Sequence, residues 1–111
     1  MLNNNNIFSN KKILIYGLGK SGLSAYQYLK KHNTLYLFDD KKISTQNIEI
    51  KRRLIKYNNI NNNKFDRIII SPGIDLNKCK LSKYLKKNLY KINTDFDIFY
   101  SFYSVCYCII F

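Results

Sequence analysis

The spacing of apolar and polar positions divides the chain into short apolar runs separated by helical patterns. Mostly aliphatic runs occupy residues 12–16, 34–38 and 67–70. Continuous apolar runs of this length, rich in isoleucine and leucine, are typical of strands that are buried on both faces of a parallel sheet. A similar run at residues 89–92 predicts a fourth strand.

Between the first two strands, apolar residues recur at the spacing of one helix face and predict a helix over residues 20–31, with a face made of Gly22, Ala25, Tyr26 and Leu29. Basic residues near the end of this pattern suit the negative end of a helix dipole, and Asn33 is a suitable stop. Weaker patterns predict helices over residues 47–57 and 78–88, and a short helix from Asp95 to Tyr100. The polar stretches at 41–46 and 58–64 predict loops.

Strands that alternate with helices through short loops indicate parallel βαβ units. We therefore predict an α/β fold: a single domain with a Rossmann-like parallel sheet and helices on both faces. This domain is expected to span residues 12–100. An Asn-rich, flexible segment would precede it at residues 1–11, and a hydrophobic tail would follow at 101–111.

The balance of charges raises the possibility of a nucleic-acid partner. The 111-residue chain carries 19 basic and 7 acidic residues, a formal net charge of +12. Basic domains often bind nucleic acids. Here, however, the excess is mostly lysine, spread along the helical patterns, and it accompanies many Asn, Ile and Tyr residues whose codons are also A/T-rich. We expect no nucleic-acid partner, and keep a basic nucleic-acid-binding protein as an alternative function.

The cysteines and the apolar tail provide evidence about the cellular compartment of the protein. Cys79, Cys106 and Cys108 are odd in number and poorly spaced for a disulfide framework or a zinc site, which favours a reducing cytoplasm. The uncharged stretch at 98–111 is shorter than the ~20 residues that cross a bilayer, so no membrane span is expected. We interpret the tail as the abnormal end of a truncated reading frame; a genuine final strand is the alternative.

A glycine turn between the first strand and the first helix is the strongest chemical signal. Gly17, Gly19 and Gly22 have the G-x-G-x-x-G spacing of nucleotide-binding turns. The first glycine permits a tight turn, the second lets a phosphate approach the backbone, and the third allows close packing of the helix. The helix N-terminus offers N–H groups and partial positive charge to that phosphate. An ordinary strand–turn–helix connection is the alternative.

Two further polar segments follow predicted strands. Asp39, Asp40 and Lys41 come directly after the second strand, and Ser71, Pro72 and Gly73 come after the third. The carboxyl ends of parallel strands meet at one edge of the sheet, where ligands bind. A carboxylate there can accept hydrogen bonds from a ribose or a base. The sequence therefore predicts a nucleotide site built from all three segments.

Four stretches resemble the N-terminal domain of the Mur ligase family: GLGKSGLS at 17–24, FDD at 38–40, IISPGI at 69–74 and TDFDIF at 94–99. The resemblance implies a Rossmann-like domain that holds the UDP part of UDP-N-acetylmuramoyl-L-alanine. It places Lys20 and Ser21, together with the three glycines, near the pyrophosphate. It places Asp39, Asp40 and Lys41 by the uracil and ribose, and the 71–73 loop over the nucleoside.

The chain also departs from that family. Full-length members use ATP and magnesium for an amide ligation in peptidoglycan synthesis, but the sequence contains no Gly-rich ATP loop ending in Gly-Lys-Ser or Gly-Lys-Thr. We therefore expect a fragment without catalytic residues, metal or cofactor of its own. A separate chain with the remaining ligase domains would complete the enzyme. A stand-alone NAD-type dinucleotide-binding module remains an alternative, because the glycine turn and Asp39 suit both ligands.

Overall fold

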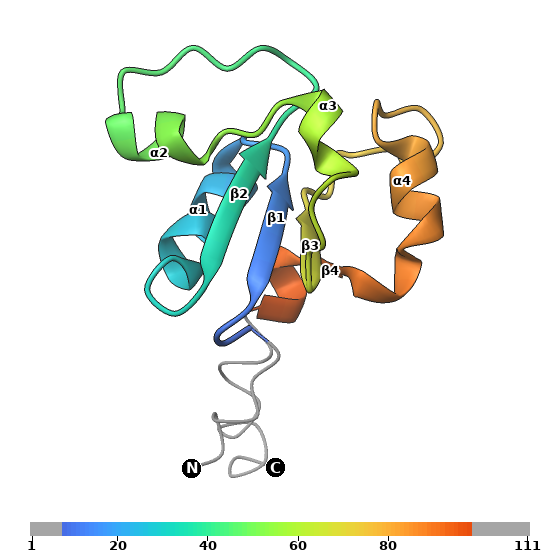
Figure 1. Cartoon of the computed structure of the whole chain (residues 1–111), viewed down its shortest axis with the longest axis horizontal. Coiled ribbons are helices and arrows are strands. Elements are labelled where there is room, and N and C mark those ends of the chain that lie inside the picture. The colour runs from blue at the N-terminus through green and yellow to red at the C-terminus, as the bar shows by residue number, and fades with distance from the viewer. Residues whose placement is uncertain (1–7, 99–111) are drawn as a thin grey trace, which may run out of the picture.

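The structure, a computed structural model, describes residues 8–98 and contains a four-stranded, all-parallel sheet in the order β2-β1-β3-β4 (Figure 1). The strands are β1 (Lys12–Tyr16), β2 (Thr34–Phe38), β3 (Arg67–Ile70) and β4 (Ile92–Thr94). The predicted α/β, Rossmann-like single domain is confirmed. The apolar tail at 101–111, with Cys106 and Cys108, lies outside the described residues, as do residues 1–7.

The first three strands have the predicted bounds, and the fourth does not. β1 pairs with β2 from Lys12 opposite Thr34 onward, and with β3 from Ile13 opposite Arg67. The predicted strand at 89–92 is wrong, because residues 89–91 form a 3₁₀ turn and β4 begins only at Ile92. Leu89 and Tyr90 are mostly exposed, so their apolar character does not reflect a place in the sheet.

The helices are α1 (Lys20–Leu29), α2 (Ile48–Arg53), α3 (Tyr57–Ile60) and α4 (Ser82–Lys87). Three of them, α1, α2 and α4, are shorter than the helices that the sequence predicted over residues 20–31, 47–57 and 78–88. The expected helix over 47–57 ends early because Leu54 and Ile55 become extended against Leu37 of β2. The loop predicted over 58–64 contains most of α3. A helix from Asp95 to Ile98 follows β4, as expected for the described part of that prediction.

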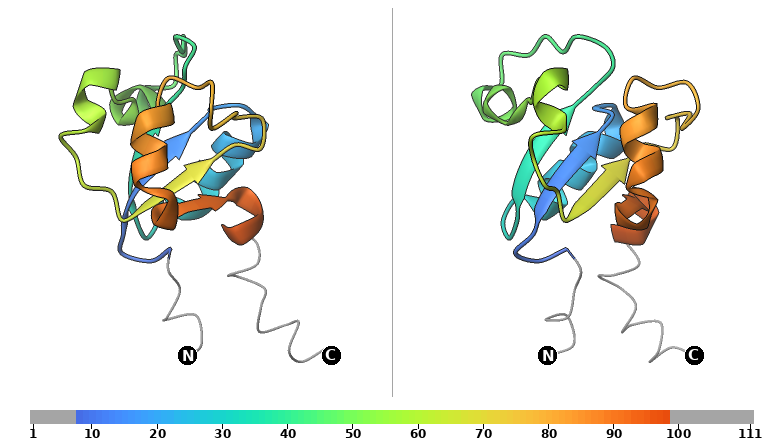
Figure 2. Two further views of the ribbon diagram at one scale, coloured as in Figure 1. Left: turned by 90° about the vertical axis from the view of Figure 1, so that its right-hand side faces the viewer. Right: turned by 45° about the vertical axis from the view of Figure 1, so that its right-hand side comes forward.

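The core has two layers because consecutive strand residues point to opposite faces of the sheet. On one face, Ile13 and Ile15 pack with α1 and with Ile98. On the other, Leu14 and Tyr16 pack with α3 and α4. Figure 2 shows α1 on one side of the sheet and α3 and α4 on the other. Helices therefore cover both faces, as predicted.

Asn33 connects three parts of the chain at the amino edge of the sheet. Its amide nitrogen donates to the carbonyl oxygens of Phe8, at 2.7 Å, and Leu29, at 2.9 Å. Its side-chain oxygen accepts from the Lys11 amide at 3.0 Å. Phe8 is buried in the core. The N-terminal segment predicted to be flexible thus includes a core residue, which its Asn-rich surroundings did not indicate.

We expect Asn33→Ala to lower the free energy of unfolding by about 2 kcal/mol, because each lost hydrogen bond contributes roughly 0.5–1.5 kcal/mol. Chemical denaturation of both proteins measures the loss. Asn61→Ala, at an exposed position of the same residue type, serves as the control and should cost less than about 0.5 kcal/mol. Equal losses in the two variants would contradict the assigned role.

Candidate functional site at the carboxyl edge of the sheet

Gly17 makes the tight turn that leaves β1. Its φ angle is +98°, a region that residues with a side chain rarely adopt. A Cβ at this position would lie 2.6 Å from the Ser71 hydroxyl oxygen. The Gly17 amide donates to the Phe38 carbonyl oxygen at 2.8 Å, which joins the turn to the end of β2. Glycine is therefore required here by both backbone conformation and space.

The other two glycines of the turn have different surroundings. A Cβ on Gly22 would overlap the backbone carbonyl oxygen of Gly17, so the close packing of α1 on the turn depends on the missing side chain. A Cβ on Gly19 would meet nothing within 4 Å. Gly19 is exposed and its φ is −76°, so neither the fold nor the backbone demands glycine there.

Helix α1 begins directly after this turn. Gly19 is its N-cap residue and provides no side-chain cap. Ser21 does not cap the helix either, because its hydroxyl donates to the Asp95 carboxylate at 2.7 Å. Lys20 is exposed beside it. The positive end of the helix dipole and a lysine side chain therefore meet at the glycine turn, an arrangement that favours an anion.

Both carboxylate oxygens of Asp39 accept hydrogen bonds from backbone amides. One carboxylate oxygen accepts from the Leu18 amide in the glycine turn at 2.7 Å, and the other accepts from the Lys41 amide at 2.9 Å. Each carboxylate oxygen can accept a further hydrogen bond. Asp39 is only half-buried. It therefore holds the turn in place and retains the capacity to accept from a ligand hydroxyl.

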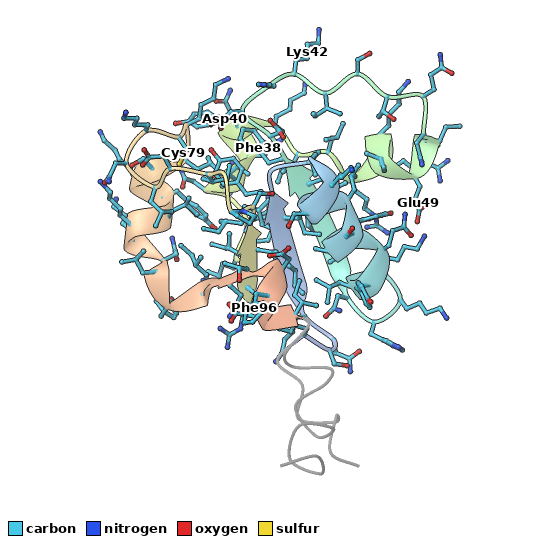
Figure 3. The ribbon with its side chains drawn as sticks, turned by 180° about the vertical axis from the view of Figure 1, so that it is seen from behind. Phe38, Asp40, Lys42, Glu49, Cys79 and Phe96 are labelled. Atoms are coloured by element: carbon cyan, nitrogen blue, oxygen red, sulfur yellow. The ribbon has the colours of Figure 1, made fainter. Side chains whose placement is uncertain are left out.

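Asp40 has different partners from its neighbour. Its carboxylate accepts from the Tyr16 hydroxyl and, at 3.3 Å, from the Lys80 amide. Figure 3 places Asp40 and Cys79 near the Phe38 end of the sheet. Burial, followed by the hydrogen bond to Asp40, raises the pKa of Tyr16 far above its ordinary value, so the hydroxyl stays protonated as a donor. The sequence grouped the two aspartates; the structure connects them to different segments.

The Ser-Pro-Gly segment lies against the glycine turn. The Ser71 amide donates to the Tyr16 carbonyl oxygen at 3.1 Å, and its hydroxyl donates to the Gly17 carbonyl oxygen at 3.2 Å. Pro72 and Gly73 are exposed, and a Cβ on Gly73 would meet nothing within 4 Å. This loop therefore presents an open surface beside Gly17.

These segments meet at the point where the strand order reverses. The chain passes from β1 to β2 on one side and returns to β3 on the other. In open parallel sheets the ligand-binding crevice is found at such a point, which here is between the carboxyl ends of β1 and β3. Hydrogen bonds join the segments there: the Leu18 amide donates to the Asp39 carboxylate, and the Ser71 hydroxyl donates to the Gly17 carbonyl oxygen. Lys41 is exposed beside them. The structure thus brings together the three segments that the sequence predicted would converge.

Tyr16 and Asp95 were not among the predicted site residues. A tyrosine that ends an otherwise aliphatic strand could have marked Tyr16 as unusual. Asp95 lies inside the TDFDIF stretch, but its hydrogen bond to Ser21 joins residues 74 positions apart and depends on the order of the strands. No local pattern reveals such a pair.

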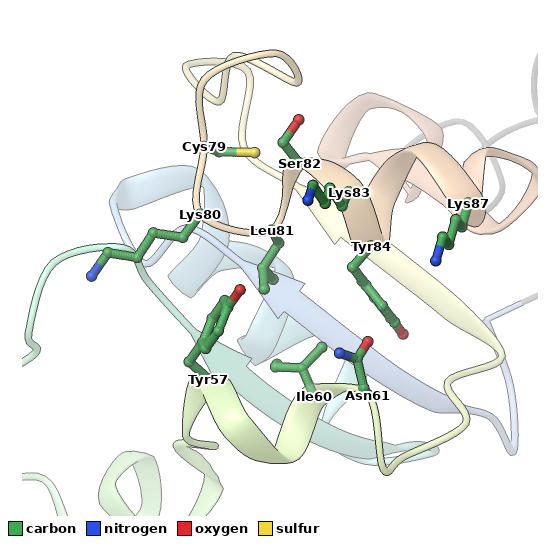
Figure 4. A pocket seen from close by; sticks show the side chains of 10 residues that line it. All are labelled: Tyr57, Ile60, Asn61, Cys79, Lys80, Leu81, Ser82, Lys83, Tyr84 and Lys87. Carbon is green, nitrogen blue, oxygen red and sulfur yellow. The ribbon is translucent and has the colours of Figure 1, made fainter.

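A separate cavity of about 450 Å³ lies between α3 and α4 (Figure 4). Its lining includes Tyr57 and Tyr84 together with Lys80, Lys83 and Lys87. Apart from the segment that leads into α4, it shares nothing with the crevice, and no predicted site residue lines it. The nucleotide prediction therefore depends on the crevice alone.

The described range, residues 8–98, contains neither a candidate metal centre nor a candidate membrane span. In that range, no group of three or more His, Cys, Asp or Glu residues is arranged to hold a metal ion. No helix within the same range is long and apolar enough to span a bilayer. Cys79 is the one cysteine there, and it forms no disulfide.

Comparisons with known proteins cover the part of the chain that forms this site. Residues 11–92 match the family described as Mur ligase MurD-like, N-terminal domain. The chain is 36% identical over 78 residues to the UDP-N-acetylmuramoylalanine--D-glutamate ligase of Caldicellulosiruptor saccharolyticus, covering 61% of this chain and 17% of the relative. It is 29% identical over 97 residues to the ligase of the same name from Rickettsia bellii, covering 85% and 21%.

The ligase of that name from Caldicellulosiruptor bescii is 35% identical over 88 residues, covering 71% of this chain and 19% of the relative. The chain therefore spans about a fifth of the length of the curated relatives it matches. No solved structure matches it significantly.

Proposed function

Because the chain belongs to the Mur ligase family, as a MurD-like N-terminal domain, we propose that it binds the UDP part of UDP-N-acetylmuramoyl-L-alanine in the crevice between β1 and β3. Its role is to hold this substrate for UDP-N-acetylmuramoylalanine--D-glutamate ligase, in the synthesis of peptidoglycan precursors in the cytoplasm. The chain acts as a substrate-binding domain and is not catalytic by itself.

The observation that carries this proposal is the contrast among the three glycines. Gly17 and Gly22 are explained by the turn and by helix packing, whereas Gly19 faces open space at the N-terminus of α1. A glycine that the fold does not need, at a helix N-terminus, is what a bound phosphate requires, because its oxygens must approach the backbone N–H groups. The pyrophosphate is therefore assigned to the Gly19–Ser21 turn, with Lys20 beside it.

The nucleoside is assigned to the neighbouring segments. Asp39 has acceptor capacity left for a ribose or uracil group, and Lys41 is exposed next to it. The open Pro72–Gly73 surface can cover a flat ring, because neither residue projects a long side chain. Asp40 contributes indirectly, since its carboxylate is already bonded to Tyr16 and Lys80.

The ligation chemistry is assigned to other parts of the enzyme. The family's ATP and magnesium do not fit residues 8–98, where no cluster of metal-binding side chains occurs, and the sequence contains no Gly-rich ATP loop. Those groups, with the site for D-glutamate, would belong to the remaining ligase domains. If these reside on a separate chain, that chain is the partner that completes the enzyme.

A thermal-shift titration tests the proposal. We expect UDP-N-acetylmuramoyl-L-alanine to raise Tm, because at a ligand concentration ten times Kd a ligand that binds only the folded state adds about 1.4 kcal/mol. NADH at equal concentration should produce little shift. A folded sample that melts cooperatively but does not respond to millimolar UDP-sugar would contradict the proposal. A larger shift with NADH would favour the dinucleotide module, and binding to RNA that falls steeply with salt would favour the nucleic-acid alternative.

A further inference from the structure

Three hydrogen bonds join the ends of β1 and β2 to each other and to the segment that leads into α4. The Tyr16 hydroxyl donates to Asp40 and accepts from the Leu81 amide at 3.4 Å. The Lys80 amide donates to the other oxygen of Asp40 at 3.3 Å. The paired residues lie between 24 and 65 positions apart in the chain. We call this group of four residues the Tyr16 clamp.

Packing alone does not explain a tyrosine at this position. Tyr16 has no exposed surface, and its ring packs against Phe38 with the ring centroids 5.6 Å apart. A phenylalanine would preserve this apolar contact. Burying a hydroxyl costs free energy unless it is hydrogen-bonded, so what the tyrosine adds is the connection to Asp40 and Leu81.

Tyr16 forms hydrogen bonds with both ends of the loop at residues 71–81. At the first end, the Ser71 amide donates to the Tyr16 carbonyl oxygen. At the second end, Leu81 bonds to the Tyr16 hydroxyl. Between these anchors lie the exposed Pro72 and Gly73. One residue at the end of β1 therefore fixes both ends of the loop that carries the Ser-Pro-Gly segment.

We propose that Tyr16, acting with Asp40, is a positioning residue that holds the 71–81 loop across the crevice and thereby determines how tightly the nucleoside of a UDP-sugar is bound. This inference rests on the proposed function. According to this inference, Asp40 affects binding by positioning the 71–81 loop and not by contact with the ligand. Without the clamp, ligand binding must also order the loop, and that entropic cost reduces affinity.

The first experiment compares Tyr16→Phe with Tyr26→Phe. Tyr26 is a matched control because it is equally buried and its hydroxyl also pairs with a carboxylate, that of Glu49, on the opposite face of the sheet. Burial and this pairing raise the pKa of Tyr26 to about 12. Isothermal titration with UDP-N-acetylmuramoyl-L-alanine should give about tenfold weaker binding for Tyr16→Phe and less than twofold for Tyr26→Phe, at similar losses in Tm. Equal affinities in the two variants would overturn the positioning role.

The second experiment needs no ligand. Hydrogen exchange of the Lys80 and Leu81 amides should be about tenfold faster in Tyr16→Phe than in the unmodified protein, and unchanged in Tyr26→Phe. Unchanged exchange in Tyr16→Phe would overturn the clamp itself. If the unmodified protein does not bind the UDP-sugar, the proposed function fails, and the exchange rates still decide whether the clamp exists.

A third variant, Asp40→Ala, breaks the clamp without changing Tyr16 and should also weaken binding of the UDP-sugar by about tenfold. Asp40→Ala removes the carboxylate that joins the hydroxyl to Lys80. Because both residues act in one network, combining Asp40→Ala with Tyr16→Phe should weaken binding by less than the sum of the two separate losses. Additive losses in the double variant would show that Asp40 and Tyr16 act independently, and would overturn their joint action.

Discussion

Replacing Gly22 by alanine is expected to lower the free energy of unfolding by about 3 kcal/mol, at the upper end of the usual cost of overpacking. The added Cβ would overlap the backbone carbonyl oxygen of Gly17. No side-chain rotation can relieve a clash with backbone, so either α1 must move away from the turn or the turn must open. For a domain of this size we expect Tm to fall by roughly 12 °C or more.

Gly19→Ala is the matched control for this change. It introduces the same methyl group three residues earlier in the same turn, where nothing lies within 4 Å of the new atom. Its loss of stability should stay below about 1 kcal/mol, because alanine is a poorer N-cap residue than glycine but its methyl group meets no other atom. Urea denaturation of both variants measures the difference. Similar losses would mean that the close packing of α1 on the turn is not important for stability.

Replacing Gly19 by valine is expected to weaken binding of UDP-N-acetylmuramoyl-L-alanine by 10- to 100-fold or more while leaving Tm nearly unchanged. The branched side chain would occupy the open space in front of the α1 N-terminus, where we assign the pyrophosphate. A phosphate kept away from the backbone loses charge-assisted hydrogen bonds that contribute roughly 1.5–3 kcal/mol each. Isothermal titration measures the affinity, and a thermal melt of the free protein measures the stability.

Gln27→Val provides the comparison, because it places the same side chain on the exposed face of α1, eight positions after Gly19 and away from the turn. Its affinity should match that of the unmodified protein. If Gly19→Val bound the UDP-sugar with undiminished affinity, the phosphate would have to lie elsewhere, even if the chain still bound the ligand.

The predicted fold was most accurate where burial follows from local sequence. The aliphatic runs of β1, β2 and β3 are buried on both faces, so their pattern and their bounds coincide. The run at 89–92 looks alike in sequence, yet Leu89 and Tyr90 are exposed and β4 starts later. Whether an apolar residue at the edge of a sheet is covered depends on what packs over that edge.

The candidate site likewise has features that the local sequence predicted and features that it did not. The glycine spacing predicted a turn, and a positive φ at Gly17 is a local demand that the residue type itself reveals. The paired aspartates predicted a polar strand end, but not that Asp39 would hold the glycine turn while Asp40 binds Tyr16. Adjacent residues in an extended chain point in opposite directions, so their partners differ even when their chemistry is the same.

By itself, the sequence determined the alternation of strands and helices, the backbone conformation of the turn, and the three segments that follow strand ends. These depend on periodicity and on the conformational preferences of single residues, which act over a few positions. Only the tertiary structure decided that Ser21 meets Asp95 and that Tyr16 holds both ends of the 71–81 loop. Such pairs are brought together by the order and register of the parallel strands, and these depend on the packing of the whole core.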